Sequence, residues 1–383
     1  MKEVVIVDAV RTPIGKAKGI FDTVRADELG IAAVQGLLDR NPFDLSLIED
    51  VVFGCVMQQE EQGFNVARQI SLQVGIPVEA SAATVNRLCG SSLQALNQSV
   101  QAIIAGCGDV YIVGGVEHMG HIPMAKGVDF NPKLFKHFSK GSVHMGPSAE
   151  LLSVKYNISR EEQDAFALRS HQKAVSAQKE GRFKDEIIPL YSHLADGTRV
   201  LVDKDQGVRE DTSLEALARL SPPFQPDGGR VTAGNASQIS DGASAMLVMS
   251  LERAKDLGME PMAKVIAMAT AGVAPSMFGM GPVESTKKAL KRSVLSLSDI
   301  EVIEINEAFA AQALTDIQQL NLDEARINMN GGAIALGHPL GCSGARISTT
   351  LLHIMKDKKL SIGLATMCIG LGQGITTIFE SMN

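Results

Sequence analysis

The sequence repeats one order of predicted elements in two halves. Leu88–Ser91 and Leu340–Ser343 stand 252 positions apart, and each opens a predicted helix with Cys, Gly and Ser close together. A strand predicted over 299–305 matches one over 49–53. Strands that alternate with helices predict parallel pairing and a layered α/β core. Two unrelated α/β units are the alternative, but the shared order and the constant offset favour duplication.

One mismatch between the halves predicts an insertion. In the second half, the strand over 363–368 is followed at once by a closing strand over 374–379. In the first half the equivalent closing strand, over 245–249, comes far downstream of the strand and turn that contain Val116. Long insertions at the end of a rigid sheet usually carry a binding function. The predicted division is a first half of residues 1–118 with 241–260, an inserted loop domain of residues 119–240, and a second half of residues 261–383.

Composition and charge narrow the function classes. The chain has 383 residues, 45% of them apolar, a net charge of −7 and no Trp. Lys and Arg are scattered, so no basic stripe for nucleic acid is expected. We expect no signal peptide and no transmembrane segment, because the first residues predict a strand and no apolar run is long enough to span a bilayer. The sequence therefore predicts a cytoplasmic protein.

The five cysteines predict neither a disulfide framework nor a metal centre. Their number is odd and no CxxC pair occurs, which is typical of a reducing compartment. His338 and Cys342 are four positions apart, but no second pair of ligands stands nearby, so no zinc site is expected. Any special cysteine in this chain is therefore expected to act through its reactivity.

Cys89 is the first candidate for such reactivity. It follows an extended segment that ends at Val85, and Leu93, Leu96 and Val100 continue after it at helical spacing. We therefore place it in the first turn of a helix, where unpaired N–H groups and the helix dipole favour a thiolate and lower the thiol pKa below about 8.5. A thiol of this kind is a candidate nucleophile. The alternative is a buried, unreactive cysteine.

Three further candidates stand at predicted strand ends in the second half. Asn306 follows the strand over 300–305, His338 follows an extended run over 327–334, and Cys368 precedes a Gly-rich turn. Ligands of α/β sheets bind beyond the carboxyl ends of strands, so these side chains and Cys89 are expected to converge. Each has a simpler explanation when taken alone, as a turn former, a turn cap or a small core residue. Their joint occurrence in duplicated halves favours a site.

Five motifs together resemble the thiolase family. They are NRLCGSS at 86–92, VTAGNAS at 231–237, NEAFAAQ at 306–312, NGGAIALGHPLGCSGAR at 330–346 and ATMCIGLGQG at 365–374. The likeness spans essentially the whole chain, and GVEHMGHIPM at 115–124 is most similar to the branch that supplies the β subunit of bacterial fatty-acid oxidation complexes. The family fold is two βαβαβαββ halves in a layered α-β-α-β-α core, with a loop domain inserted in the first half. This α/β fold agrees with the repeat and the insertion.

The resemblance implies thiolytic cleavage of a 3-ketoacyl-CoA by CoA, which yields acetyl-CoA and a shortened acyl-CoA. Cys89 would attack the 3-keto carbon and form an acyl-cysteine. His338 would take the thiol proton and, together with a water held by Asn306, would stabilise the enolate oxygen. Cys368 would protonate the enolate and then deprotonate the incoming CoA. The backbone N–H groups of Cys89 and Gly370 would form a second oxyanion hole. No metal and no redox cofactor is implied.

The resemblance also places contacts to CoA in the inserted segment. Arg209 would meet the adenine nucleotide, and Phe224 and Met145 would line the path of the pantetheine. The family has a Met near Gly281, where this chain has the run Met277–Met280 with a Met at each end, so this contact is not assigned to one side chain. The full implied set is His144, Met145, Arg209, Phe224, Ala233 and Ser237.

Two alternative functions stay open, and the resemblance also implies partners. The same residues could condense two acetyl-CoA molecules in the biosynthetic direction. A thiolase relative could also bind acyl-CoA or lipid without catalysis, but such a relative is expected to lack part of the catalytic set, which this chain retains. The resemblance further implies a homodimer that joins the multifunctional α subunit of the fatty-acid oxidation complex as an assembly of two α and two β subunits.

Overall fold

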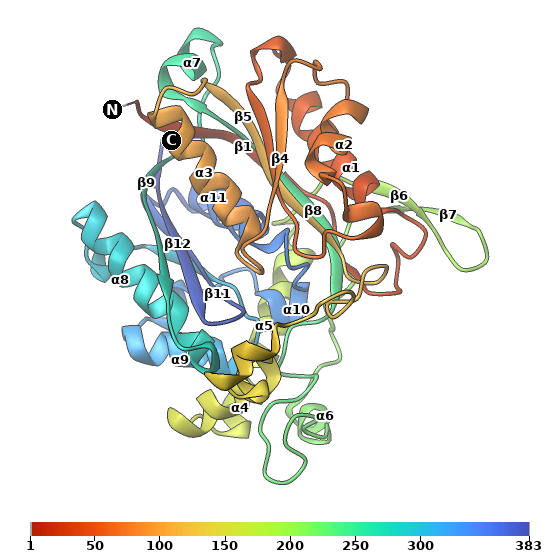
Figure 1. Ribbon diagram of the computed structural model, residues 1–383, viewed down its shortest axis with the longest axis vertical. Coiled ribbons are helices and arrows are strands. Elements are labelled where there is room, and N and C mark those ends of the chain that lie inside the picture. The colour runs from red at the N-terminus through yellow and green to blue at the C-terminus, as the bar shows by residue number, and fades with distance from the viewer. Residues whose placement is uncertain (1, 383) are drawn as a thin grey trace.

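The computed structural model describes residues 2–382, and ten of its strands form one continuous sheet with two related parts, each called a sheet below (Figure 1). The other two strands, β6 and β7, pair with each other apart from it. Five strands of the first half lie in the order β4-β3-β5-β8-β1. β3 is parallel to β4 and β5, whereas β8 is antiparallel to β5 and β1. The bounds are β1 Val4–Arg11, β3 Asp50–Gly54, β4 Ser81–Val85, β5 Val110–His118 and β8 Ser240–Ser250, and the short β2 (Gly15–Lys16) pairs with β8.

The second half repeats this order as β10-β11-β12-β9. The bounds are β9 Ala263–Gly272, β10 Val302–Ile305, β11 Ile362–Ile369 and β12 Gln373–Ser381. Elements that begin at 50, 91 and 110 in the first half have counterparts that begin at 302, 343 and 362, so the offset of 252 predicted from the sequence holds at three places. The two sheets join where β1 pairs with β9, at Val5 with Lys264 and Ile6 with Ala263.

Helices cover and separate the two sheets in five layers (Figure 1). α1 (Ala26–Arg40) and α2 (Val66–Gln73) pack on the outer face of the first sheet. α3 (Ser91–Ile104) and α11 (Ser343–Lys358) lie between the sheets, where one hydrophobic core combines side chains of both helices and both sheets. α8 (Gly281–Ser293) and α9 (Ala310–Leu320) cover the outer face of the second sheet. The predicted α-β-α-β-α layering is confirmed.

The two central helices touch at their first turns. A Cβ placed on Gly344 would lie 2.5 Å from the backbone nitrogen of Leu93, so only glycine permits this approach. The N–H of Ala345 donates to Ser92 Oγ at 2.8 Å. Because both contacts involve the beginning of a helix, the loops that precede α3 and α11 are brought to the same place. These are the loops that contain the predicted Cys89 and His338.

Residues 327–334 do not form the extended run that the sequence predicts. One isolated bridge joins this segment to Ile303 of β10, and the chain then turns at Asn328, which has φ 45°. The Asn328 side chain accepts from the N–H of Ile305 at 2.8 Å and donates to its carbonyl at 2.9 Å, so it occupies the edge of β10 in place of a strand. Asn tolerates this left-handed conformation better than most residues. A short helix, α10 (Ala333–Leu336), follows.

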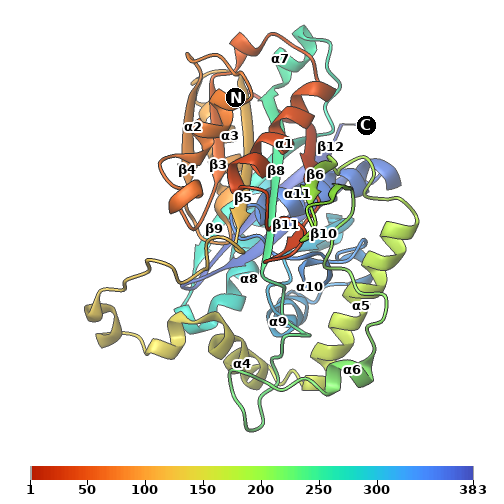
Figure 2. The ribbon, with the colours of Figure 1, turned by 90° about the vertical axis from the view of Figure 1, so that its right-hand side faces the viewer.

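The chain between β5 and β8 extends away from the layers, as Figure 2 shows. Its helices α4, α5 and α6 lie together at the lower end of the molecule in both views. Its elements are α4 (Met145–Lys155), α5 (Arg160–Lys179), β6 (Leu190–His193), β7 (Arg199–Val202) and α6 (Leu214–Ala218), and α7 (Leu251–Asp256) follows β8. None of the helices within residues 2–382 is long and apolar enough to cross a membrane.

A buried ion triad fastens this segment to the layered core. Arg11, at the end of β1, donates to both carboxylate oxygens of Asp205 at 2.7 and 2.9 Å and to Glu186 Oε1 at 2.6 Å. All three side chains are fully buried. Asp205 Oδ1 also accepts from the N–H of Ile14 at 2.8 Å. Removal of the cation would leave two carboxylates in an apolar environment, which is strongly destabilising.

We expect Arg11→Ala to lower the free energy of unfolding by about 3–5 kcal/mol, because Glu186 and Asp205 would stay buried without a cation. Urea titration followed by circular dichroism measures this change. The control is Arg169→Ala, which removes an ion pair with Glu324 whose two side chains are about half exposed. That control should change the free energy by about 1 kcal/mol or less. Equal losses in the two variants would contradict the role given to the triad.

Candidate active site

Cys89 lies in a strained loop that connects β4 to α3. Leu88 has a positive φ of 46°, a conformation that costs roughly 1–3 kcal/mol for a residue other than glycine. Asn86 Oδ1 accepts from the N–H of Leu88 at 2.8 Å, and Ser91 Oγ accepts from the N–H of Arg87 at 2.9 Å. These two side chains hold the loop in its strained form. The position of Cys89 is therefore set by its neighbours in the loop.

The prediction that Cys89 belongs to the first turn of a helix is wrong by two positions. α3 begins at Ser91, and Gly90 is its N-cap. Cys89 is 7% exposed, and burial raises the pKa of its thiol to about 11, although the N–H groups of Gly370 and of Cys89 itself favour the thiolate. Desolvation of the anion outweighs these two donors. The predicted low pKa is wrong for this reason, and the thiol is protonated at neutral pH.

His338 is fixed by hydrogen bonds to its backbone and its ring. Gly337 precedes it with φ 109°, and the N–H of His338 donates to Ser240 Oγ at 3.2 Å. Nδ1 of the ring lies 2.5 Å from Ser343 Oγ. The Ser343 hydroxyl donates to the carbonyl of Pro339 at 2.7 Å, so its oxygen accepts from Nδ1–H. This network assigns the lone pair of the neutral ring to Nε2.

Asn306 faces this ring from the second sheet. It directly follows β10, and its Nδ2 lies 3.3 Å from His338 Nε2. Its Oδ1 is buried without a hydrogen-bond partner among the residues described. Burial lowers the pKa of His338 to about 3, and the charge of Arg346 acts in the same direction. The site therefore combines a neutral imidazole with a neutral thiol.

Cys368 and Gly370 come from the end of β11 and the turn after it. Burial raises the pKa of the Cys368 thiol well above its ordinary value, and Cys89 and Asp316, when ionised, raise it further. The two thiols therefore lie close enough to influence each other. A Cβ placed on Gly370 would lie 3.1 Å from the Leu88 side chain, so glycine lets this turn approach the Cys89 loop.

Two contacts join these groups of residues. Leu88 and Leu340, which stand beside Cys89 and His338 in the chain, pack against one small hydrophobic cluster. The N–H of Asn306 donates to the carbonyl of Thr366 on β11 at 3.0 Å, two residues before Cys368. The structure thus places the loops of Cys89, Asn306, His338 and Cys368 next to one another, at the ends of the elements from which they come.

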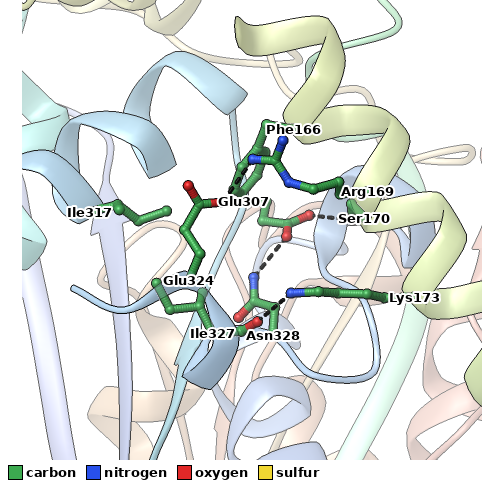
Figure 3. Close-up of a pocket in the computed structure, with 9 residues that line it drawn as sticks. All are labelled: Phe166, Arg169, Ser170, Lys173, Glu307, Ile317, Glu324, Ile327 and Asn328. Atoms are coloured by element: carbon green, nitrogen blue, oxygen red, sulfur yellow. Dashed lines mark hydrogen bonds and ion pairs between the residues drawn. The ribbon is translucent and has the colours of Figure 1, made fainter. Parts of the chain in front are cut away.

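Glu307 belongs to the motif NEAFAAQ but receives no role from the sequence, and the structure makes it a positioning residue. Its buried carboxylate accepts from Ser170 Oγ at 2.7 Å, from Asn328 Nδ2 at 2.8 Å and from the N–H of Ile334 at 3.1 Å. Figure 3 shows Ser170 reaching this carboxylate from α5. Glu307 therefore ties the loop of Asn306 to the inserted segment and to the segment before His338. Its place directly after Asn306, within a quoted motif at the end of a buried strand, is the signal that could have revealed it.

Glu117 is a positioning residue of the first half, as Glu307 is of the second. Burial raises the pKa of its carboxyl, while the hydrogen bonds that it accepts lower it. These bonds come from the N–H groups of Val56 at 2.9 Å, Met57 at 3.1 Å and Gly341 at 2.8 Å and from Gln62 Nε2 at 2.7 Å. Because Gly341 lies between His338 and α11, Glu117 fixes the loop that presents the histidine.

The predicted CoA contacts at the start of α4 lie beside the catalytic loops. His144 is the N-cap of α4 and Met145 its first residue. A Cβ on Gly146 would lie 2.3 Å from the ring of Phe224, and a Cβ on Gly370 would lie 3.7 Å from Met145 Sδ. Met277 packs in the same cluster as Met145 and Cys368. Of the two methionines that the sequence leaves unassigned, Met277 is therefore the one that packs with the predicted pantetheine contacts.

The remaining contacts lie farther out. Arg209 and Ala233 line a cavity of about 370 Å³ beside α6, and the N–H of Ser237 donates to the carbonyl of Ala308 at 3.0 Å. His171, to which the sequence gives no role, also lines the cavity. Its Nδ1 accepts from the N–H of Arg209 at 3.2 Å. Burial and then the Arg209 cation lower the pKa of His171 to about 4.

Comparison with known families accounts for this arrangement. Residues 4–252 match the family model described as thiolase, N-terminal domain, and residues 259–381 match the model described as thiolase, C-terminal domain. The chain belongs to the thiolase family. The boundary between the two thiolase matches falls at α7 and the turn after it, between the last strand of the first sheet and the first strand of the second.

Individual thiolases match the chain over nearly its whole length. The 3-ketoacyl-CoA thiolase of Marinomonas sp. (strain MWYL1) is 56% identical over 99% of this chain and 98% of its own. That of Idiomarina loihiensis is 55% identical over 99% and 100%. The solved structure of human mitochondrial 3-ketoacyl-CoA thiolase has a TM-score of 0.91 and 37% identity over 99% of each chain. The acetyl-CoA acetyltransferase of Bacillus anthracis has a TM-score of 0.91 and 36% identity over 100% of this chain and 99% of its own.

We expect the alkylation of Cys89 by iodoacetamide to accelerate roughly tenfold per pH unit between about pH 7 and 9.5. The reason is that a thiol with a pKa of about 11 is ionised only in a small fraction over this range. Peptide mapping by mass spectrometry measures the rate, and the exposed Cys107 serves as an internal reference. A rate that levels off by about pH 8 would instead favour the low pKa expected of a helix N-terminus.

Proposed function

We propose that this thiolase cleaves 3-ketoacyl-CoA with CoA in fatty-acid β-oxidation. Relatives that are 54–56% identical over 99% of the chain have the name 3-ketoacyl-CoA thiolase. The observation that best supports this chemistry is the position of the Cys89 sulfur. It faces the backbone N–H groups of Gly370 and of Cys89 itself. It lies in a loop next to that of a neutral His338, whose Nε2 has the lone pair that can accept a proton and faces Asn306 Nδ2 at 3.3 Å.

The first half-reaction transfers the acyl group to the enzyme. The Cys89 sulfur bonds to the 3-keto carbon while its proton moves to His338 Nε2. The bond between C2 and C3 then breaks, and its electron pair forms the enolate of acetyl-CoA. His338 Nε2–H and a water held by the free Oδ1 of Asn306 donate to the enolate oxygen. Cys368 gives its proton to C2, and acetyl-CoA leaves.

The second half-reaction returns the enzyme to its starting state. The Cys368 thiolate takes the thiol proton of CoA, and the CoA sulfur attacks the acyl carbonyl on Cys89. The N–H groups of Cys89 and Gly370 donate to the oxyanion of the tetrahedral intermediate. Cys89 leaves as a thiolate and recovers its proton from His338. Atoms, protons and electrons balance over the two steps, and the sequence of steps uses no metal and no redox cofactor.

CoA is proposed to lie along the inserted segment. Met145 lies beside Gly370 and the ring of Phe224 lies against the next residue, Gly146, which suits the apolar part of the pantetheine arm. Arg209 lines the outer cavity, where its cation can meet the phosphates of the nucleotide. The other proposed contacts are His144, Ala233 and Ser237. In this arrangement the thiol of CoA reaches the cysteines between the two halves.

Condensation of two acetyl-CoA molecules is the second candidate function. The same residues catalyse both directions, and one structural neighbour is named an acetyl-CoA acetyltransferase. The more similar relatives, with 54–56% identity, favour cleavage. Profiles of kcat/KM against acyl chain length distinguish the two functions, because a biosynthetic enzyme prefers acetoacetyl-CoA. A non-catalytic acyl-CoA or lipid carrier would bind CoA without any turnover.

A homodimer is the proposed assembly of this chain. β4 ends the first sheet, and its outer edge offers a strand for pairing. Phe64, in the loop before α2, is 101% exposed, and its φ of 53° fixes it in a strained turn. A large apolar side chain so placed suits a contact with a second copy. The dimer is further proposed to join the multifunctional α subunit of a cytoplasmic fatty-acid oxidation complex.

We expect Cys89→Ala to abolish the acyl-enzyme and Cys368→Ala to slow both half-reactions by roughly 100-fold or more. The first variant lacks the nucleophile, and the second lacks the acid and base. Single-turnover mixing with 3-ketoacyl-CoA of several chain lengths, followed by peptide mapping, locates the acyl group and identifies the preferred chain. Cys107→Ala, at an exposed thiol, is the control. Normal acylation in Cys89→Ala would overturn the proposed mechanism.

We expect Phe64→Asp to raise the dissociation constant of the dimer by roughly tenfold or more, because a charge would enter the apolar contact. Light scattering over a concentration series measures this constant. The control is Val294→Asp, at the C-cap of α8, where the side chain is 91% exposed. Wild-type protein that stays monomeric, or a variant that dimerises as the wild type does, would contradict this interface.

A further inference from the structure

Behind the contact of Asn306 with His338 lies a second pair of side chains. Glu304 stands two positions before Asn306, so both lie on the face of β10 that is turned toward α11. Arg346 stands one helical turn after Ser343, the residue that holds the ring of His338. Arg346 Nη1 and Glu304 Oε2 are 3.7 Å apart, and both side chains are fully buried. This pair therefore connects the strand of one catalytic residue to the helix that supports the other.

The stability of the fold does not explain this pair. Within residues 2–382, hydrogen-bond partners are missing for both carboxylate oxygens of Glu304. They are also missing for all three guanidinium nitrogens of Arg346. The separation of 3.7 Å is also longer than a charge-assisted hydrogen bond. The desolvation of such a pair commonly exceeds its attraction, and apolar side chains of equal volume often replace it without loss of stability. Some other constraint keeps two charged groups here.

The electrostatic surroundings of the pair point to His338. The other ionisable groups that act on it are Arg11, Lys173, Glu186, Glu307 and Cys342. Burial raises the pKa of Glu304 to about 8, although Arg346 opposes this shift. A carboxyl with this pKa compensates the Arg346 cation only in part at neutral pH. This cation is the charge that acts on His338 and disfavours its protonated form.

We propose that Glu304 and Arg346 are positioning residues for His338. They set the spacing of β10 against α11 that the contact between Asn306 and His338 requires, and the Arg346 cation adds to burial in disfavouring a charged histidine. Neither side chain touches the reacting atoms. The inference rests on the proposed function for its meaning, because a neutral His338 matters only if it takes a proton from Cys89.

The test compares variants of the pair by the pH profile of Cys89 alkylation. Arg346→Met removes the cation at similar length, Arg346→Lys keeps it, and Glu304→Gln removes only the carboxylate. The double variant Glu304→Gln/Arg346→Met avoids an unpaired buried acid. The matched control is Ser348→Ala, a buried hydroxyl on the same helix that bonds to Gly344 O. Circular dichroism and thermal melting establish that each variant is folded.

The rate of Cys89 alkylation is expected to rise when the cation is removed and to fall when the carboxylate is removed. Loss of the cation in Arg346→Met and in the double variant should make His338 a stronger base, favour the thiolate–imidazolium pair, and raise the alkylation rate at about pH 7 by roughly tenfold. Arg346→Lys and Ser348→Ala should keep the wild-type profile. Glu304→Gln should match the wild type at about pH 6.5 but react several-fold more slowly at about pH 9, where the wild-type carboxylate would compensate the cation. If Arg346→Met does not fold, Glu304→Gln decides.

Thiolysis is measured separately from alkylation. The two measurements distinguish a failure of the proposed function from a failure of the inference about Glu304 and Arg346. In the folded Arg346 variants without a cation, kcat for thiolysis should fall roughly tenfold or more while KM for CoA changes little. Alkylation needs no turnover, so it tests Glu304 and Arg346 even if the wild-type protein shows no thiolysis. Absence of thiolysis in the wild type would overturn only the proposed function. Profiles of Arg346→Met and Glu304→Gln that both coincide with the wild type would overturn the inference.

Discussion

The direct packing of α3 on α11 is the constraint on which the rest of the structure depends. Two sheets can share one central layer of helices only if those helices approach closely, and Gly344 allows this at Leu93. The approach aligns the beginnings of both helices, so the loops before them meet. The Cys89 loop of one half and the His338 loop of the other are then neighbours, and the bond from the N–H of Gly341 to Glu117 at 2.8 Å adds to their alignment. Duplication thus supplies the site together with the fold.

Burial in this central layer also determines the chemistry. The thiol of Cys89 has a pKa of about 11 and the imidazole of His338 a pKa of about 3, so the proton stays on sulfur in the free enzyme. In the proposed mechanism, the ion pair becomes favourable only when a carbonyl accepts the developing charge under the N–H groups that face the sulfur. A thiol held in this state is protected from oxidation and stray alkylation, which follow thiolate content. Desolvation therefore links reactivity to the presence of substrate.

The sequence predicts the elements well because their apolar spacing is a local property. The repeat order, the layering and the strand over Val110–His118 follow from it directly. The protonation of the Cys89 thiol does not follow from local spacing, because it depends on the αL conformation of Leu88 and on burial by distant segments. Glu117 bonds to Gly341 across 224 positions, and no motif contains both residues. The roles given to single residues came from the family resemblance, since spacing alone indicates only where strands end.

The side chain of Asn328 gives the two halves unequal edges. In the first half, β4 ends the sheet with no strand beyond it among the described residues, and the carbonyl of Ala82 accepts from Asn65 Nδ2 at 2.9 Å. In the second half, the equivalent edge of β10 is closed, because Asn328 takes both backbone groups of Ile305 and its own N–H donates to Ile303 O at 2.9 Å. Sheets of this kind that associate edge to edge must join like with like, which gives a closed twofold pair. A chain with two unpaired sheet edges could instead polymerise into a filament. The Asn328 side chain therefore prevents open-ended pairing through β10.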